Sequence, residues 1–522
     1  MTESGIAAAG KQQTPIQLPE LLILIGRHLS QDDLTSCVRV CHAWHNAMEP
    51  LLWTTVNSCA DMTAVVNNIH RVQSIDIDDT SFTILVNPLL LLHNQLVHLS
   101  VNQLSWEVQQ ILIHNSDSLQ SFTCRIINHH GRPDNIFLAI WNALANISHL
   151  SVLHLKMPCI QPAHYQSFSE ICERLTSLTL DSGLILCRLR SPTKQPLLKM
   201  RRLELIRNHA SSRDQLQFIE QCPNLEHLTW SLIQDIPAQP FIFHLSTLPL
   251  DRPCRIVSLD LVGANVMDSD FASILNCLSN VKRVIATESA FGEQSCERVI
   301  VSTAGSLEEL DLRKCLFVSS PMIHAILMAC KNLKRFWADD LSVQDMIKPR
   351  NPKDRWPQWK YISYTVPLDP RLDDSIVATY TDDWQWSCTG LEELELTFKE
   401  LGHHLDNSVD VVYDQLAALI RLKRLAISWR SEDEKRTIFI PSSQPRRRLD
   451  FLVGNGLERL STLTSLRELD IRGIDQLRMT VKEAEWMVEH WKSLRIIRGK
   501  MTVDMNEEAM IWRMLCASIK MT

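Results

Sequence analysis

One pattern recurs from Val72 to Leu494: an apolar residue, two others, a second apolar residue, one other, and a third apolar residue. A clear copy is Leu150-x-x-Leu153-x-Leu155, and the step from one copy to the next is often 25 or 26 residues. One strand and one short helix cannot bury their own apolar faces, so units of this length bury them by stacking on their neighbours. The pattern therefore predicts a curved α/β solenoid whose concave parallel sheet is left exposed, a surface suited to gripping another macromolecule.

We take the first apolar residue of each unit as its anchor and count about fifteen units, a few of them degenerate. The anchors are Val72, Leu96, Leu119, Leu150, Leu175, Met200, Leu225, Ile256, Val281, Leu307, Leu333, Leu391, Leu422, Leu466 and Leu494. Each of the three steps between Leu150 and Leu225 is 25 residues. Longer steps, such as that from Leu333 to Leu391, predict insertions or a repeat that the pattern does not reveal, and insertions map to loops on one edge of the stack.

Composition and charge argue against several classes of protein. The formal net charge of -7 gives no sign of the clustered Lys and Arg residues that bind the phosphates of DNA or RNA. The longest apolar runs are far shorter than the roughly 18 residues of a membrane span, and residues 1–15 lack the basic start and apolar run of a signal peptide. We therefore expect an intracellular protein, cytoplasmic, nuclear or both. The common catalytic and phosphate-binding motifs are missing from the sequence, so no catalytic residue, cofactor or metal is predicted.

The fifteen cysteines are expected to be free thiols, because their number is odd and no secretory signal accompanies them. Several stand at fixed distances from the repeats, three residues before an anchor (Cys172, Cys222, Cys330, Cys388) or three after Leu312 (Cys315). A cysteine at such a place acts as a small buried hydrophobe. The nearest approach to a zinc-binding pair is Cys37-x-x-x-Cys41, for which packing is preferred over metal.

Two sets of residues carry a resemblance to known families. Cys222-Pro-Asn-Leu225-x-x-Leu228 and Leu310-Asp-Leu312-Arg-Lys-Cys315 resemble the cysteine-containing subtype of leucine-rich repeats, which commonly follows an F-box. The N-terminal segment resembles the F-box motif, reading Leu18-Pro-Glu-Leu-Leu22-Ile23, Leu29-Ser30-Gln-Asp-Asp33-Leu34, Val40-Cys41-His-Ala-Trp44 and Leu51-Leu52-Trp53. The resemblance implies an F-box leucine-rich-repeat protein, a substrate receptor of the Skp, cullin, F-box ubiquitin ligases.

Elementary helix rules describe the same N-terminal segment. Pro19 suits the first turn of a helix that runs to about His28, Ser30 is a good N-cap for a second helix, and a third short helix should present Trp44. Three helices of this size cannot build an adequate core alone, so their apolar surface should dock on a partner. The resemblance implies that this partner is the Skp adaptor and, through it, a cullin. The predicted adaptor-binding residues are Leu18, Pro19, Leu22, Ile23, Leu29, Leu34, Val40 and Trp44. In the alternative interpretation the segment merely caps the open end of the stack.

Substrate recognition is expected on strand residues that alternate outward between the buried leucines. The predicted substrate-binding residues are Asp260, Glu309, Asp311, Arg313, Arg335, Trp337, Asp339 and Glu395. This face is mixed with an acidic lean, which fits either a solvated sheet face or an acidic cradle for a basic peptide. Trp337 is the expected anchor, because its register sends a large aromatic side chain to the open face.

The predicted domain boundaries are a disordered tail over 1–14, the F-box over 15–56, the repeats over 57–500 and a C-terminal helical cap over 501–522. Insertions are expected near 339–388 and 431–455. The tryptophans of the first insertion form either its own small core or anchors for a partner. Thr480-x-x-Glu483 and Asp504-x-x-Glu507 are expected to open the last two helices.

Together these features predict a non-catalytic substrate-recognition subunit of an SCF-type ubiquitin ligase, which binds the Skp adaptor through the F-box and an unidentified target protein through the repeats. The alternative is an interaction scaffold without a ligase role. Neither nucleic acid nor a membrane is an expected partner.

Overall fold

The computed structural model describes residues 18–57, 61–77, 95–126, 134–156, 159–160, 162–182, 184–185, 196–232, 238–247, 254–263, 266–346, 385–399, 408–430, 451–474 and 477–518. The chain divides into two compact units, Met1–Leu225 and Glu226–Thr522, each with its own run of strands and helices. The predicted tail over 1–14 and most of both predicted insertions lie outside the described residues, among them Trp356, Trp359 and Trp384.

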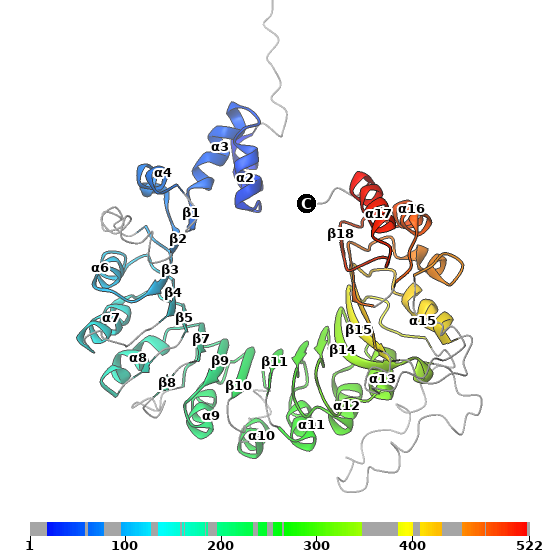
Figure 1. The fold of residues 1–522 in the computed structure, drawn as a ribbon. Coiled ribbons are helices and arrows are strands. Elements are labelled where there is room, and N and C mark those ends of the chain that lie inside the picture. Colours follow the sequence, from blue (N-terminus) through cyan, green and yellow to red (C-terminus); the bar gives the residue numbers. More distant parts are fainter. Residues whose placement is uncertain are drawn as a thin grey trace, which may run out of the picture. The chain divides into compact units, whose positions relative to one another are not determined.

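The first unit begins with three helices, α1 (Pro19–Gly26), α2 (Gln31–Cys37) and α3 (His42–Leu52). Its main sheet follows in the order β1 (Thr55–Asn57), β2 (Ser74–Ile77), β3 (His98–Gln103), β4 (Ser121–Ile126), β5 (Val152–Lys156), β7 (Ser177–Asp181) and β9 (Arg202–Asn208). All neighbours pair in parallel. The connections hold α4 (Met62–Asn67), η2 (Ile69–Arg71), α6 (Trp106–His114), α7 (Asp134–Asn146), η3 (Pro162–His164), α8 (Tyr165–Cys172) and α9 (Ser212–Glu220), and β6 (Cys159–Ile160) pairs with β8 (Leu184–Ile185). Figure 1 shows α6, α7, α8 and α9 on one face of this sheet.

The second unit continues the same alternation. Its parallel sheet has the order β10 (His227–Leu232), β11 (Ser258–Asp260), β12 (Arg283–Ile285), β13 (Glu309–Asp311), β14 (Arg335–Ser342), β15 (Glu393–Lys399), β16 (Arg424–Arg430), β17 (Glu468–Gly473) and β18 (Ile496–Arg498). The connections hold α10 (Ala238–Ser246), α11 (Asp268–Asn276), α12 (Glu293–Arg298), η4 (Val299–Thr303), α13 (Ser320–Ala329), η5 (Val343–Met346), α15 (Ser408–Ala417), η9 (Leu457–Thr462), α16 (Val481–His490) and α17 (Met505–Ser518). The fold class predicted from the repeats is confirmed: three N-terminal helices precede a long parallel sheet with a helix in most connections.

The predicted anchors fix the register of both sheets. Every one of the fifteen lies two residues before the first residue of a strand, and all fifteen side chains are buried. The third and fifth residues after an anchor, such as Leu310 and Leu312 after Leu307, are buried on the same face of the strand. Among the described strands of the two main sheets, the pattern missed β1. The residue two places before β1 is the half-buried Trp53, and the residue at its third apolar position is Ser58.

The longer steps between anchors are insertions and not hidden repeats. β14 pairs directly with β15 across the step from Leu333 to Leu391, and β16 pairs directly with β17 across the step from Leu422 to Leu466. Because each strand already has its successor as its neighbour, no additional strand can lie between them in the sheet.

In several repeats a left-handed residue stands seven residues after the anchor, near the end of the strand or shortly after it. Ser182, Arg207, Glu288, Lys314 and Asp340 have φ between 47° and 66° there, and Gly263 has a φ of 63°. A side chain makes this conformation costly, so the turn must be held by other contacts.

Those contacts come from the residue that follows the left-handed one. Asn208 accepts a hydrogen bond from the Ala210 amide at 2.9 Å, and Ser289 accepts one from the Phe291 amide at 3.2 Å. Cys315 instead donates its thiol to the Ala286 carbonyl of the preceding repeat at 2.9 Å. These bonds fix the sharp turn that leads from strand to helix.

The cysteines that precede anchors behave as predicted. Cys172, Cys222, Cys330 and Cys388 are buried free thiols, whereas Cys315 is half-buried. Burial raises the pKa of Cys222 and of Cys388 to about 12, so both remain neutral and unreactive. Packing was predicted for both Cys37 and Cys41. Cys37 is half-buried against the core of the N-terminal helices, whereas Cys41 is exposed, so the prediction is wrong for Cys41.

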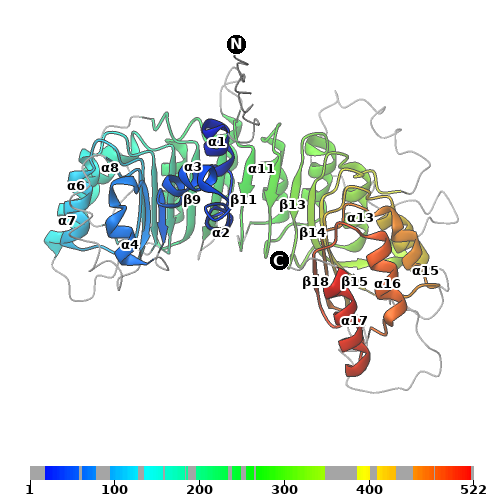
Figure 2. The same cartoon turned by 90° about the horizontal axis from the view of Figure 1, so that it is seen from above.

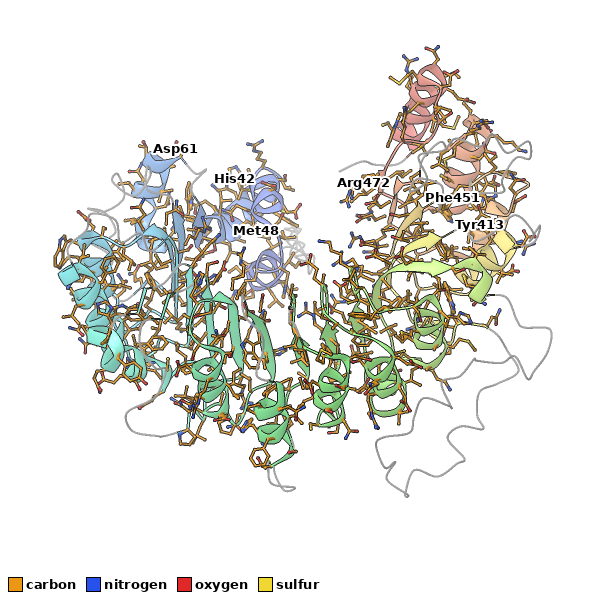
Figure 3. All side chains as sticks on the ribbon, turned by 60° about the horizontal axis from the view of Figure 1, so that its bottom comes forward. His42, Met48, Asp61, Tyr413, Phe451 and Arg472 are labelled. Carbon is orange, nitrogen blue, oxygen red and sulfur yellow. The ribbon has the colours of Figure 1, made fainter. Side chains whose placement is uncertain are left out.

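Hydrogen bonds to residues of neighbouring repeats hold the chain in place directly after each long insertion. Trp386 is buried, its indole N–H donates to His324 Nδ1 at 3.2 Å, and its amide donates to Gln415 at 2.8 Å. After the second insertion, the Phe451 amide donates to the Tyr413 hydroxyl at 3.1 Å, and Figure 3 shows the two residues close together. These contacts restore the repeat register after each interruption.

Two capped helices end the described chain. Thr480 and Glu483 form the predicted capping box of α16, and Asp504 accepts hydrogen bonds from the amides of Asn506 and Glu507 at the start of α17. Figure 2 shows α16 beside α17. Both helix starts were predicted from the sequence and are confirmed. No helix among the residues that the structure describes has the length and apolarity needed to cross a bilayer.

We predict that His324 makes the second unit sensitive to acid. Burial lowers the pKa of His324 to about 4, because the charged imidazolium would lose its hydration there. Its Nδ1 accepts a hydrogen bond from the Trp386 indole N–H. The unfolded chain, with an ordinary pKa near 6.5, binds the second imidazole proton earlier, so stability is lost as the pH falls from about 7 to 4, by about 3 kcal/mol. His324→Asn keeps an acceptor near Nδ1 and removes the titration. Thermal midpoints measured between pH 7 and pH 4 should converge on those of the variant, and parallel curves would contradict this assignment.

Candidate functional site

The first candidate surface lies on α1, whose residues are apolar on nearly every side. A helix of that kind needs cover all round. Among the described residues of the first unit, only one side of α1 is covered, where Leu22 and Gly26 are buried. Leu21, Leu24 and Ile25 lie on the other side at helical spacing and are 40% to 54% exposed. This face is an unpaired apolar surface.

A small core holds the three N-terminal helices together. It consists of Leu22, Leu34, Ala47 and Met48, with Ile23, Leu29 and Trp44 packed partly against it. Pro19 occupies the first turn of α1, and Ser30 caps α2 by accepting a hydrogen bond from the Asp33 amide at 3.2 Å. The predicted three helices and their caps are therefore confirmed, although α1 ends at Gly26, two residues before the predicted end.

Gly26 lets α1 approach α3 closely. A Cβ atom at this position would lie 2.5 Å from Leu51 Cδ1 and 2.5 Å from Met48 Sδ. Met48 is fully buried, so it has no free space into which to move. Figure 3 shows Met48 within this group of helices.

The predicted adaptor-binding residues separate into two groups in the structure. Leu22 and Leu34 belong to the small core and present no surface, and Ile23, Leu29 and Trp44 are half-buried against it. Leu18, Pro19 and Val40 are exposed, Val40 at 64%. The sequence interpretation missed Leu21, Leu24 and Ile25, although the run Leu21-Leu-Ile-Leu-Ile25 itself signalled a helix that needs cover on two sides. We call Leu18, Leu21, Leu24, Ile25 and Val40 the exposed apolar face.

The same helices also cover the first strand of the sheet. Gln31 Nε2 donates to the Leu52 carbonyl at 2.7 Å and to the Thr55 carbonyl of β1 at 3.4 Å. Glu49 accepts a hydrogen bond from the Trp53 indole at 3.0 Å and forms an ion pair with Arg71. The segment therefore caps the end of the first sheet while leaving the exposed apolar face free.

The second candidate surface is the outward face of β12 to β18, where charges alternate from strand to strand. At the first strand position the register places Arg283, Glu309, Arg335, Glu393, Arg424 and Glu468 side by side. Arg283 Nε lies 2.8 Å from Glu309, Arg424 Nε lies 3.3 Å from Glu468, and Arg335 also pairs with Glu309. The face is held by ion pairs that cross from one repeat to the next.

A second charge ladder runs one residue earlier, where the chain enters each strand. Glu308 lies 3.2 Å from Lys282 and 2.6 Å from Lys334, and Glu392 lies 2.7 Å from Lys423. Hydrogen bonds from Lys334 and Lys282 lower the pKa of Glu308. We call Lys282, Glu308, Lys334, Glu392 and Lys423 the lysine ladder.

An Asp-x-Arg clamp occurs twice on this face with the same geometry. Arg313 donates Nε to Asp311 Oδ1 at 3.0 Å and Nη2 to Oδ2 at 2.6 Å. Arg472 donates to Asp470 through the same atoms at the same two distances. The hydrogen bonds that Arg313 donates to Asp311 raise the pKa of Arg313, and those that Arg472 donates to Asp470 raise the pKa of Arg472. Each guanidinium is therefore held in one orientation.

The predicted substrate-binding residues do not form a row of solvent-exposed side chains. Glu309 and Asp311 point to the outward face but are only 5% and 3% exposed, because guanidinium groups lie over them. The expectation that they stand open to solvent is wrong. Trp337 is half-buried, with the Arg313 guanidinium 5.7 Å from its ring centre.

The remaining predicted residues also have intramolecular partners. Glu395 lies 3.4 Å from Arg313, and Asp339 accepts hydrogen bonds from the Lys314 amide and the Thr397 hydroxyl at 2.7 and 3.3 Å. Asp260 is half-buried on β11, beside Ile285 of β12. The structure thus brings Glu309, Asp311, Arg313, Arg335, Trp337, Asp339 and Glu395 onto adjacent strands, with Asp260 two strands away from Asp311.

Comparison with known proteins adds one assignment. Residues 19–58 match the family described as F-box-like. No curated protein matches the chain. Among solved structures, the chain is similar to one in the complex of Rad7 and Elc1 from yeast, at 12% identity and a TM-score of 0.38, covering 63% of this chain and 85% of that one. It is also similar to one in the TLR13 complex with ssRNA13, at 12% identity and a TM-score of 0.37, covering 83% of this chain and 65% of that one. These two likenesses are too distant to bear on function.

We predict that the small core of the three N-terminal helices depends on Gly26. Gly26→Val places atoms where Leu51 and Met48 already lie, and overpacking of this kind costs about 1–3 kcal/mol. Amide hydrogen exchange in α1 and α3 should accelerate accordingly. Gly305→Val is the matched control, because a Cβ there meets nothing within 4 Å. Equal protection of α1 and α3 in the two variants would show that the close approach is not needed.

Proposed function

We propose that this chain is a non-catalytic substrate-recognition subunit of an SCF-type ubiquitin ligase. The F-box-like segment binds the Skp adaptor and, through it, a cullin. The repeats bind a target protein. In this assignment the F-box covers 15–56, the repeats 57–500 and the C-terminal cap 501–522, and the protein acts inside the cell, in the cytoplasm, the nucleus or both.

The observation that carries the proposal is the coincidence of a family match with an unpaired apolar surface. The F-box-like match covers residues 19–58, and the exposed apolar face lies almost wholly within it. Five large apolar side chains within 23 residues are unfavourable in water unless a partner covers them. The adaptor contacts are therefore Leu18, Pro19 and Val40 from the predicted set together with Leu21, Leu24 and Ile25, whereas Leu22 and Leu34 act by shaping α1 and α2.

The role of the repeats follows from their architecture. A stack of parallel strands leaves one face of the sheet without covering helices, and solenoids use such faces to hold other macromolecules. The buried cysteines before the anchors support the cysteine-containing subtype of leucine-rich repeats, which commonly accompanies an F-box.

A scaffold without a ligase role is the second candidate, and one observation favours it. Gln31 and Glu49 tie the three helices to β1 and η2, so the segment serves as an end cap whether or not it binds an adaptor. The two candidates differ in whether the exposed apolar face has a partner.

We predict that Leu24→Glu with Ile25→Glu abolishes adaptor binding without unfolding the protein. Leu24 and Ile25 are 54% and 40% exposed, so a carboxylate at either position can reach water in the free chain. An adaptor that covered this surface would leave the carboxylate buried without a partner. Losing two buried aliphatic contacts lowers the affinity for the purified Skp adaptor at least about a hundredfold, measured by isothermal titration calorimetry.

Leu316→Glu is the control for a charge placed on an exposed leucine elsewhere, since Leu316 is 88% exposed on the loop after β13. It should bind the adaptor as the wild type does. Adaptor affinity that survives the double change at unchanged thermal stability would refute the α1 contact and favour the scaffold.

A further inference from the structure

In the ion pairs on the outward face of the second unit, the arginine side chain is more exposed to solvent than its carboxylate partner. The Arg335 side chain is 49% exposed above Glu309 at 6%, and the Arg472 side chain is 66% exposed above Asp470 at 9%. Arg313 covers Asp311 in the same way. The carboxylates lie against the sheet, and the guanidinium groups form the outer layer.

Six arginines make up this outer layer, which we call the arginine face: Arg283, Arg313, Arg335, Arg424, Arg472 and Arg498. Each pairs with a carboxylate that is less exposed than itself. A ligand that approaches from solvent therefore meets N–H donors first, although the formal charges of the pairs nearly cancel.

The lysine ladder differs in its carboxylates, which are more exposed than those beneath the arginine face. Glu308 and Glu392 are 32% and 40% exposed beside Lys334 and Lys423 at 53% and 44%. A ligand there meets both signs of charge at similar depth. The ladder thus provides an internal comparison for the arginine face.

The clamps leave donors for a ligand. Asp470 accepts hydrogen bonds from Nε and Nη2 of Arg472, and the outer side of this largely exposed guanidinium faces solvent. A guanidinium has five N–H donors in a planar fork that matches a carboxylate. Because the clamp already fixes its orientation, little freedom is lost when a ligand binds.

The spacing of the arginines selects an extended acidic chain. Arg283, Arg335 and Arg424 lie on β12, β14 and β16, two strands apart, which corresponds to about 10 Å. A chain in the extended polyproline II conformation advances about 3.1 Å per residue with three residues per turn, so every third side chain lies on the same face, about 9 Å from the last, and meets the next arginine. Between these arginines, Glu393 and Glu395 of β15 remain about one-third exposed. They would repel an acidic residue, so the ligand residue that lies over them should be neutral.

We infer that the arginine face binds an extended segment of a partner protein that carries an acidic residue at about every third position, with small neutral residues between. This inference names the class of target for the proposed receptor and so rests on that function. It replaces the acidic cradle for a basic peptide as the interpretation of this face. A nucleic acid is less suited, because the carboxylates beneath the guanidiniums oppose a continuous run of phosphates.

The test measures binding of three fluorescent peptides of about eighteen residues to the full chain by anisotropy. They repeat Glu-Ser-Gly, Gln-Ser-Gly and Lys-Ser-Gly. The Glu peptide should bind at least about tenfold more tightly than the other two, since each charge-assisted contact contributes appreciably to affinity. Equal binding of the Gln or Lys peptide would overturn the inference, as would tighter binding of oligouridylate.

Two charge-neutral variants locate the site. Asp311→Asn, Arg313→Gln, Asp470→Asn and Arg472→Gln together remove both clamps and leave the net charge unchanged, and this variant should bind the Glu peptide at least about tenfold more weakly. Glu308→Gln, Lys334→Gln, Glu392→Gln and Lys423→Gln remove the same charges from the lysine ladder and should change affinity less than about twofold. Equal effects of the two variants would overturn the assignment to the arginine face.

The single change Arg472→Gln keeps the test valid if the clamp variant does not fold, because this side chain is largely exposed. It should weaken binding of the Glu peptide severalfold; unchanged affinity would count against the inference. Adaptor binding is measured on the same preparations. Loss of adaptor binding with intact peptide binding would refute the ligase role and not the arginine face, and the reverse result would do the opposite.

Discussion

Burial of one apolar anchor two residues before each strand is the contact on which the rest of the structure depends. The anchor and the third and fifth residues after it bury their side chains between neighbouring repeats, as Leu307, Leu310 and Leu312 do. This burial fixes the register of the fifteen strands that follow an anchor, because a slip of one residue would turn the apolar side chains toward solvent. The positions of the outward side chains, including every ion pair of the arginine face, follow from that register.

The sequence predicted the parts of the fold that depend on neighbours along the chain. The fifteen anchors, the Ser30 and Thr480 caps and the three N-terminal helices could be located because apolar spacing and capping are local signals. β1 was missed because its first apolar place holds the half-buried Trp53 and its third holds Ser58. The insertions were located by broken spacing, but their return points at Trp386 and Phe451 depend on His324, Gln415 and Tyr413, which lie 29 to 62 residues away.

The candidate sites were harder to predict, for the same physical reason. Register alone showed that Glu309 and Asp311 face outward, but their burial depends on arginines from neighbouring repeats and from two residues further along the strand. The acidic lean of the sequence thus became an arginine surface in the structure. On α1, the sequence predicted Leu22 as an adaptor contact, whereas the structure buries it in the small core, and only the packing of α3 against Gly26 shows which leucines remain outside.

The account requires that one chain hold an adaptor and an acidic segment at the same time through separate surfaces. Native mass spectrometry of the full chain mixed with purified Skp adaptor and the Glu-Ser-Gly peptide tests this most directly. The account predicts a ternary species with one copy of each component. Species that contain the adaptor or the peptide but never both, or a chain that binds neither, would contradict it.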